Sequence, residues 1–177
     1  MDAYVFVNEA TSEAIDALRR LAEDPGSDVR YAAALFGPAD AICAVSASDL
    51  ASLRQLVLGP IRATGASSTT TALVLDGGES AFSLPIPKWS PPSPQAAFVQ
   101  VKVAPGSATD VAQRLAGIDG VTGVAIVAGA FDILAEVGGD TADDVARILL
   151  EYLHPVEGIV STASLFVAPE PTVSTTD

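Results

Sequence analysis

The chain contains one sequence pattern twice, and this internal repeat limits the possible folds more than any other feature. Short apolar segments, charged helix residues and glycine-containing turns recur in the same order in the two halves. A unit of this size that occurs twice is a small domain, whereas a solenoid is built from many shorter repeats. The matched pairs are Ala3–Val7 with Ala97–Val101, Asp16 and Arg20 with Asp110 and Arg114, Gly37–Asp40 with Gly129–Asp132, and Gly65–Thr69 with Gly158–Thr162.

Composition restricts the partners of the protein. The chain has 177 residues, of which 49% are hydrophobic, so each half can form a core of its own. The formal net charge is −13 and the nine Lys and Arg residues are scattered, which argues against direct binding to nucleic acid or to anionic membrane surfaces. The sequence contains no signal peptide and no apolar stretch of membrane-spanning length, so we expect a soluble, cytoplasmic protein.

Residues suited to catalysis or metal binding are scarce. Cys43, the only cysteine, lies in an apolar run that is typical of a buried strand, so neither a disulfide framework nor a cysteine-rich metal site is expected. His154, the only histidine, lies at the end of a predicted helix, where a cation is favoured. Because clustered metal ligands and phosphate-binding loops are also missing from the sequence, we expect no cofactor, no metal and no enzymatic activity.

Each half carries the same order of predicted elements, β-α-β-β-α-β, which is the ferredoxin-like order. Short apolar, β-rich runs predict the strands, and apolar residues at helical spacing predict the helices, in the corresponding segments of both halves. In the first half we expect strands at 3–7, 29–36, 40–46 and 67–75, a helix capped by Thr11 or Ser12, and a helix capped by Ser48 that Pro60 ends or kinks. In the second half we expect strands at 97–103, 121–128, 131–137 and 160–168, a helix with a capping box of Ser107 and Asp110, and a helix with a box of Thr141 and Asp144.

The sheets of the two halves are expected to face one another. Helices can cover only one face of each four-stranded sheet, yet the central strands are apolar on both faces and need a second covering layer. The fold class is therefore α+β, with two ferredoxin-like βαββαβ repeats packed sheet to sheet as an intramolecular pseudo-dimer that resembles a dimeric α/β barrel. The predicted boundaries are 1–75 for the first repeat, 76–95 for a Pro-rich linker in which Trp89 packs as an anchor, 96–168 for the second repeat and 169–177 for a disordered tail.

A Gly-x-x-Asp turn is the polar feature that both halves share. It joins Gly37 to Asp40 in the first half and Gly129 to Asp132 in the second. One interpretation is hairpin structure, in which glycine permits a positive φ and the aspartate accepts hydrogen bonds from nearby backbone amides. The other is a binding site, in which backbone amides and a carboxylate hold the two charged ends of an amino acid.

The second half resembles the effector-binding domain of the Lrp/AsnC family, which is also called the RAM domain. The resemblance covers about Ala97–Ala168, and the first half, about Ala3–Leu75, is similar but degenerate because it has Pro38-Ala39-Asp40 where an aromatic-Asp pair is expected. The residues that carry the resemblance are the segment Phe98–Gly106, the segment Leu115–Val121, the turn and strand Val127–Val137, and Gly158-Ile159-Val160-Ser161-Thr162.

The resemblance implies a function as well as a fold. Members bind small effectors, typically amino acids, near the glycine-aromatic-Asp turn at the contact between dimers, and they assemble into homo-oligomers. Carried over to this chain, the ligand-binding residues are Gly129, Phe131 and Asp132, with Ser161, Thr162, Gly37 and Asp40 as weaker candidates. Family transcription factors also carry a helix-turn-helix, for which no room precedes the first predicted strand at Ala3.

The sequence therefore favours a stand-alone effector-binding protein that senses an amino-acid-like molecule and acts by assembly. Such a protein would regulate transcription through a DNA-binding relative of the Lrp/AsnC type. Two other functions remain open. Sheet-to-sheet α+β barrels also include small monooxygenases and isomerases, and a pocket that combined His154 with a carboxylate would favour an enzyme. The third possibility is a purely structural assembly protein.

Overall fold

The computed structural model describes residues 1–75 and 95–169, and both halves have the predicted β-α-β-β-α-β order. Each second helix passes directly into a π-helical segment, labelled η. The first repeat consists of β1 (Asp2–Asn8), α1 (Ser12–Glu23), β2 (Val29–Phe36), β3 (Ala41–Ser46), α2 (Leu50–Leu56), η1 (Val57–Ile61) and β4 (Ser68–Val74). The second repeat consists of β5 (Gln95–Val103), α3 (Ala108–Ala116), β6 (Val121–Ala128), β7 (Ile133–Gly139), α4 (Ala142–Arg147), η2 (Ile148–Leu153) and β8 (Ile159–Val167).

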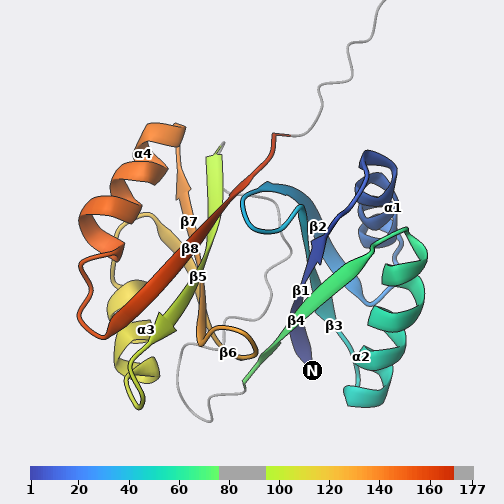
Figure 1. The fold of residues 1–177 in the computed structure, drawn as a ribbon, viewed down its shortest axis with the longest axis horizontal. Coiled ribbons are helices and arrows are strands. Elements are labelled where there is room, and N and C mark those ends of the chain that lie inside the picture. The colour runs from blue at the N-terminus through green and yellow to red at the C-terminus, as the bar shows by residue number, and fades with distance from the viewer. Residues whose placement is uncertain (76–94, 170–177) are drawn as a thin grey trace, which may run out of the picture.

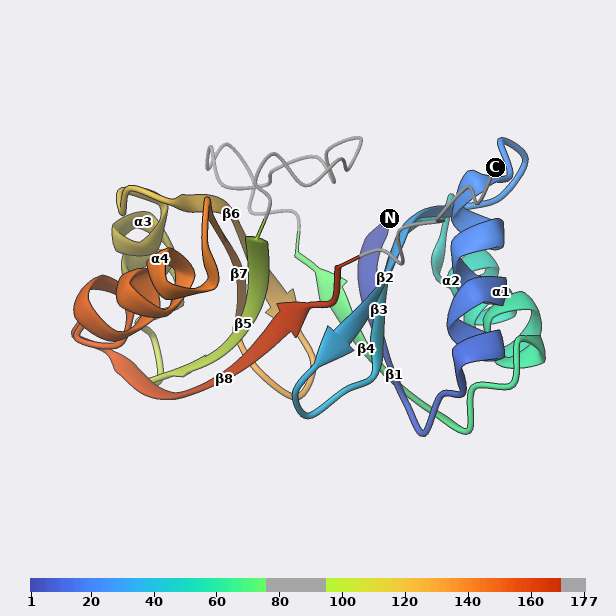
Figure 2. The ribbon, with the colours of Figure 1, turned by 90° about the horizontal axis from the view of Figure 1, so that it is seen from above.

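The strands form a closed barrel in the order β1-β3-β2-β8-β5-β7-β6-β4. Within each repeat the four strands are antiparallel, and the two sheets face one another with the helices on the outside (Figure 1, Figure 2). Two edge contacts close the barrel: β2 pairs with β8 through Leu35 and Phe36, and β4 pairs with β6 through Leu73 and Val74. The predicted fold class, with the repeats packed sheet to sheet, is confirmed.

Three apolar cores hold this arrangement together, because each sheet buries both of its faces. One core lies between α1, α2, η1 and the outer face of the first sheet, and it contains Cys43, which is fully buried as predicted. A second core lies between the helices and the outer face of the second sheet. The third fills the barrel interior and draws residues from both repeats, including Phe6 and Leu35 from the first and Phe98 and Leu134 from the second. The two repeats therefore share one core.

Two of the predicted helix caps are confirmed and two are wrong. Thr11 accepts a hydrogen bond from the Ala14 amide at 3.2 Å, and Thr141 with Asp144 forms a complete capping box. The N-cap of α2 is Asp49 rather than Ser48, and its carboxylate accepts from the Ser52 amide at 2.7 Å. Ser107 makes no side-chain cap, because its backbone is already helical (φ −94°, ψ −2°) and N-cap residues normally lie in the β region.

Pro60 does not end the first repeat's second helix, because helical backbone continues through it to residue 63. The π-helical turn is a property of the repeat rather than of Pro60, since η2 has the same form without proline. Buried residues show how the two segments align: Leu53, Leu56, Val57 and Ile61 correspond to Val145, Ile148, Leu149 and Leu153.

The predicted linker lies outside the described residues except for Gln95, which begins β5. Trp89 and the predicted tail beyond Pro169 also lie outside them. Of the helices in residues 1–75 and 95–169, none has the length and apolar character needed to cross a bilayer.

Candidate functional site

The turn Gly129–Asp132 connects β6 to β7 and fixes the end of β5. The Asp132 amide donates to the Val101 carbonyl oxygen at 3.0 Å, and the Asp132 carbonyl oxygen accepts from the Val127 amide at 2.9 Å. Its carboxylate oxygen Oδ2 accepts from the Val103 amide, also at 2.9 Å. Asp132 thereby joins three backbone segments, and a carboxylate in this position satisfies an amide that the sheet leaves unpaired.

Asp40 makes the same three contacts in the first repeat. Its amide donates to the Val7 carbonyl oxygen at 2.9 Å, its carbonyl oxygen accepts from Leu35 at 2.8 Å, and Oδ2 accepts from the Ala10 amide at 3.1 Å. The aspartate of the shared Gly-x-x-Asp pattern thus has the structural role that the hairpin interpretation proposed in both repeats, whereas the positive φ that it proposed for the glycine occurs at Gly37 and not at Gly129. That role leaves the second carboxylate oxygen of each aspartate with acceptor capacity.

The glycine of each turn lies against the last strand of the other repeat. A Cβ on Gly129 would lie 3.2 Å from the Thr71 carbonyl oxygen of β4, and a Cβ on Gly37 would lie 2.9 Å from the Ser164 carbonyl oxygen of β8. Gly37 also has a φ of +152°, which side-chain-bearing residues rarely adopt. The turns therefore lie at the two contacts that close the barrel.

Phe131 points into the barrel. Its side chain is buried, and its ring meets Phe6 of the first repeat edge to face, with 5.7 Å between the ring centroids. In the first repeat the matching position is Ala39, which is also buried. The exposed part of the second turn consists of Gly129 and Ala130, with Asp132 partly exposed beside them.

Ser161 and Thr162 lie on β8 opposite the end of β5. Thr162 pairs in register with Val101, whose carbonyl oxygen also binds the Asp132 amide, and Ser161 pairs with Lys102. The Thr162 hydroxyl lies 3.1 Å from the Nε2 atom of His154, within hydrogen-bonding distance. Asp132 thus lies beside β5 on its β7 side and Ser161 and Thr162 lie on its β8 side, whereas Gly129 lies farther along the turn, against β4.

Glu136 is a notable residue that the sequence interpretation missed. It lies on β7 and is 7% exposed, on the same side of the strand as Leu134, which lines the barrel interior. Burial raises its pKa from 4.5 to about 7, with an opposing contribution from the Thr122 hydroxyl. Burial, followed by the charge of Glu136 and then of Asp2, raises the pKa of Tyr4 to about 12. The available sequence signal was a single carboxylate at an inward position of an apolar strand.

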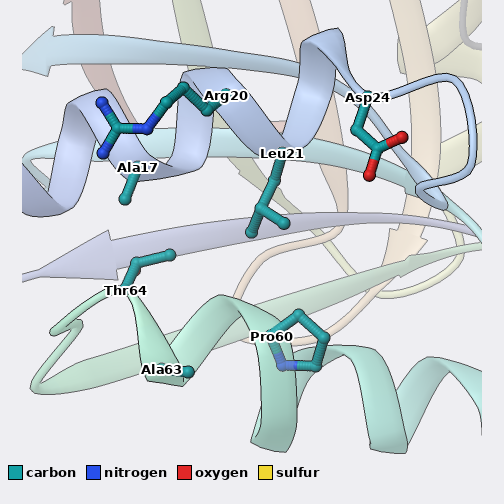
Figure 3. Close-up of a pocket in the computed structure, with 7 residues that line it drawn as sticks. All are labelled: Ala17, Arg20, Leu21, Asp24, Pro60, Ala63 and Thr64. Carbon is teal, nitrogen blue, oxygen red and sulfur yellow. The ribbon is translucent and has the colours of Figure 1, made fainter.

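Two of the cavities that are lined by residues of the described ranges lie on the helical surfaces. The first has a volume of about 410 Å³ and lies beside α1 and η1; in it the Arg20 guanidinium and the Asp24 carboxylate extend in opposite directions (Figure 3). The second, of about 430 Å³, lies at the end of α3 beside η2. Neither is lined by His154, so neither has the combination of histidine and carboxylate that would favour an enzyme. In the described part of the chain, no three potential metal ligands lie together.

Sequence comparison identifies the second repeat. Residues 96–176 match the family model of the Lrp/AsnC ligand binding domain. An uncharacterized HTH-type transcriptional regulator of Pyrococcus furiosus is 38% identical over 72 residues, which are 39% of this chain and 48% of the regulator. A similar regulator of Pyrococcus horikoshii is 32% identical over the same shares of the two chains. The chain thus spans about half the length of the curated relatives it matches.

Solved structures resemble the arrangement of both repeats. A siroheme decarboxylase, solved in complex with an iron-uroporphyrin III analogue, superposes with a TM-score of 0.69 at 10% identity, covering 95% of this chain and 71% of the enzyme. A putative monooxygenase of Fusobacterium nucleatum superposes with a TM-score of 0.51 at 10% identity, covering 95% and 90%. At such identities the likeness concerns the fold alone. The family match, in contrast, runs from the second residue of β5 through β8 and includes the turn between β6 and β7, so the second repeat of this chain matches the Lrp/AsnC ligand binding domain along almost its whole length.

Proposed function

We propose that the chain is a non-enzymatic effector-binding protein that senses a small, amino-acid-like molecule and responds by a change in assembly. The observation that carries the proposal is the match of residues 96–176 to a ligand binding domain, since this range contains the complete turn and the end of β8. The relatives described as HTH-type transcriptional regulators support a regulatory role for that domain.

The proposed site lies beside the exposed part of the second turn. Gly129 leaves the backbone accessible. Asp132 supplies a partly exposed carboxylate that accepts one hydrogen bond, from the Val103 amide, and can accept others. Ser161 of β8, which pairs with Lys102, adds a hydroxyl group near the end of β5, whereas Thr162 points to the other face of the sheet, toward His154. An ammonium group suits the carboxylate, and hydroxyls and backbone amides suit the ligand carboxylate, so an α-amino acid fits this chemistry.

The first repeat offers a poorer version of the site. Gly37 and Asp40 keep the backbone and the carboxylate, but Ala39 replaces the aromatic residue. We propose that the second turn is the functional one and that the first preserves the fold. Because the two copies lie in one chain, they could diverge in this way, which identical subunits of a homodimer cannot do.

Assembly would couple the site to regulation. A ligand bound at a contact between copies of the chain shifts the oligomer equilibrium only through its different affinity for the free and the assembled forms. The proposed partners are further copies of this chain and DNA-binding proteins of the Lrp/AsnC type. With a net charge of −13, the chain itself is poorly suited to contact DNA directly.

A thermal-shift screen with the twenty amino acids, followed by calorimetry and light scattering, tests the proposal. At an amino acid concentration of about a hundred times Kd, binding stabilises the folded state by about 2.7 kcal/mol. Asp132→Asn keeps an oxygen acceptor for the Val103 amide but removes the charge, so the ligand response should fall while the fold persists. Asp40→Asn is the matched control, since it changes the same structural contact in the other repeat. No stabilisation by any amino acid, or equal ligand responses of the two variants, would contradict the proposal.

A further inference from the structure

The second helical cavity differs from the candidate turn and is built from a separate part of the second repeat. Its volume is about 430 Å³ and it is lined by Gly117, Ile118, Asp119, Gly120, Arg147, Ile148 and Tyr152. Four of these residues form the loop between α3 and β6, and the other three come from the end of α4 and from η2. A cavity of this size falls in the lower part of the range for small-molecule sites.

Two of the lining residues, Gly120 and Ile148, pack closely against one another. Gly120 has a φ of +88°, and a Cβ built on it would collide with the Cδ1 atom of Ile148. Its carbonyl oxygen accepts a hydrogen bond from the Gly138 amide at 2.9 Å, which ties the loop to the end of β7. The corresponding loop of the first repeat, residues 24–28, has no residue with positive φ. The loop shape is therefore specific to the second repeat.

The cavity carries one charge of each sign. Arg147 contributes a guanidinium and Asp119 a carboxylate, while Ile118 and Ile148 provide apolar walls. Arg147 has one weak ion pair, 3.8 Å from an Asp144 oxygen, and both side chains are substantially exposed. Such a pair contributes little to stability, and Asp144 is already held by the capping box with Thr141. The guanidinium is therefore available for a second anionic partner.

The cation and the aromatic group are absent from the same places in the first repeat. The buried positions of the two helices align Arg147 with Gln55 and Tyr152 with Pro60. The buried framework is thus retained in both repeats, whereas the residues at the cavity differ: the first repeat's cavity beside Pro60 takes its two charges from Arg20 and Asp24 instead.

We propose that this cavity is a second small-molecule site and that it holds a zwitterionic amino acid with an apolar side chain. The Arg147 guanidinium binds the ligand carboxylate and the Asp119 carboxylate binds the ammonium group. The ligand side chain packs against Ile118, Ile148 and the exposed ring of Tyr152. This site is independent of the proposed effector site at Asp132.

An NMR titration of the backbone amides of the full chain with L-leucine tests the proposal. We expect shifts at residues 117–120 and 147–152, saturating below about 10 mM, the range of a weak small-ligand site. Because charge-assisted hydrogen bonds are lost, Arg147→Gln, which restores the first-repeat residue, should weaken binding by about tenfold or more. Arg114→Gln is the matched control, because Arg114 pairs with Glu157 at 3.7 Å and does not line the cavity.

Two analogues of L-leucine test whether the cavity binds both the carboxylate and the ammonium group of the ligand. Isocaproate has the carboxylate without the ammonium group, and isopentylamine has the ammonium group without the carboxylate, so each should bind about tenfold or more weakly than L-leucine. Asp132→Asn should leave these shifts unchanged. The proposal is overturned if shifts are absent or confined to residues 129–132, if Arg147→Gln behaves like Arg114→Gln, or if either analogue binds as well as L-leucine. Shifts confined to residues 129–132 would instead support the proposed effector site.

Discussion

The ring of Phe131 meets the ring of Phe6 edge to face, with 5.7 Å between their centroids and 82° between their planes. One ring belongs to the turn of the second repeat and the other to β1 of the first, and both are buried in the barrel interior. The aromatic residue that the family resemblance assigns to the ligand site is therefore also a contact between the repeats.

Phe131→Ala should reduce the free energy of unfolding by about 3–5 kcal/mol, since it leaves a cavity and removes an aromatic pair. Urea denaturation followed by circular dichroism measures the change. Phe36→Ala is the control, because Phe36 is 66% exposed and its truncation should change the free energy of unfolding by less than about 1 kcal/mol. Similar losses in both variants would show that the Phe131–Phe6 contact does not stabilise the fold.

Glu136 should make stability depend on pH. Its carboxyl has a pKa of about 7 in the folded protein and an ordinary pKa of 4.5, because burial disfavours the charged form. The folded state therefore retains a proton that the unfolded state releases. The associated stability is fully present below pH 4.5 and is lost as pH rises to about 7, a change of about 3 kcal/mol.

Glu136→Gln should remove this pH dependence, since an amide stays neutral. The variant should be more stable than the native chain at pH 8 and about equally stable at pH 4. Urea denaturation across this range checks the prediction. Glu157→Gln serves as a control because the Glu157 side chain is 92% exposed. A native chain whose stability does not fall between pH 4.5 and 7 relative to Glu136→Gln would contradict it.

Much of the fold could be predicted because local signals agreed with one another. The apolar stripe of α1 and the short apolar run of β1 each had a counterpart in the other repeat, so a weak pattern in one half was supported by the second. The need to cover both faces of each sheet then led to the sheet-to-sheet packing. The contacts of β2 with β8 and of β4 with β6 could not be predicted, because they depend on few residue pairs between sequence-distant edges.

The candidate site was harder to predict than the fold, because the sequence does not show which groups its polar residues bind. A Gly-x-x-Asp pattern has the same sequence whether its carboxylate binds a ligand or a backbone amide, and only the structure shows the bonds of Asp132 to Val103 and of Asp40 to Ala10. Glu136 gave no periodic signal, since a single carboxylate in an apolar strand is recognised as buried only when both faces of the sheet are known to be covered.

The two turn aspartates should contribute equally to stability. Asp132→Ala leaves the Val103 amide without its side-chain acceptor, and Asp40→Ala does the same to the Ala10 amide. Each should reduce the free energy of unfolding by about 1–3 kcal/mol. Thermal denaturation without ligand measures both. If only Asp132→Ala were destabilising, the shared bonding pattern would not reflect a shared structural role.

Gly37 should be among the least replaceable glycines of the described residues, because two constraints act on it together. Its φ of +152° disfavours any side chain, and an added Cβ would come within 2.9 Å of the Ser164 carbonyl oxygen on β8. Gly37→Ala should therefore strain the turn and push apart β2 and β8, and the free energy of unfolding should fall by about 2–4 kcal/mol.

Gly59→Ala is a matched control: a Cβ at Gly59 meets nothing within 4 Å, and alanine is favoured over glycine in helical backbone by about 1 kcal/mol. Hydrogen exchange of the Phe36 and Ala168 amides, which lie at the β2–β8 contact, would localise the effect. Faster exchange there in Gly37→Ala but not in Gly59→Ala is the expected result, whereas unchanged exchange in both would mean that the close approach of Gly37 to β8 does not hold the barrel closed.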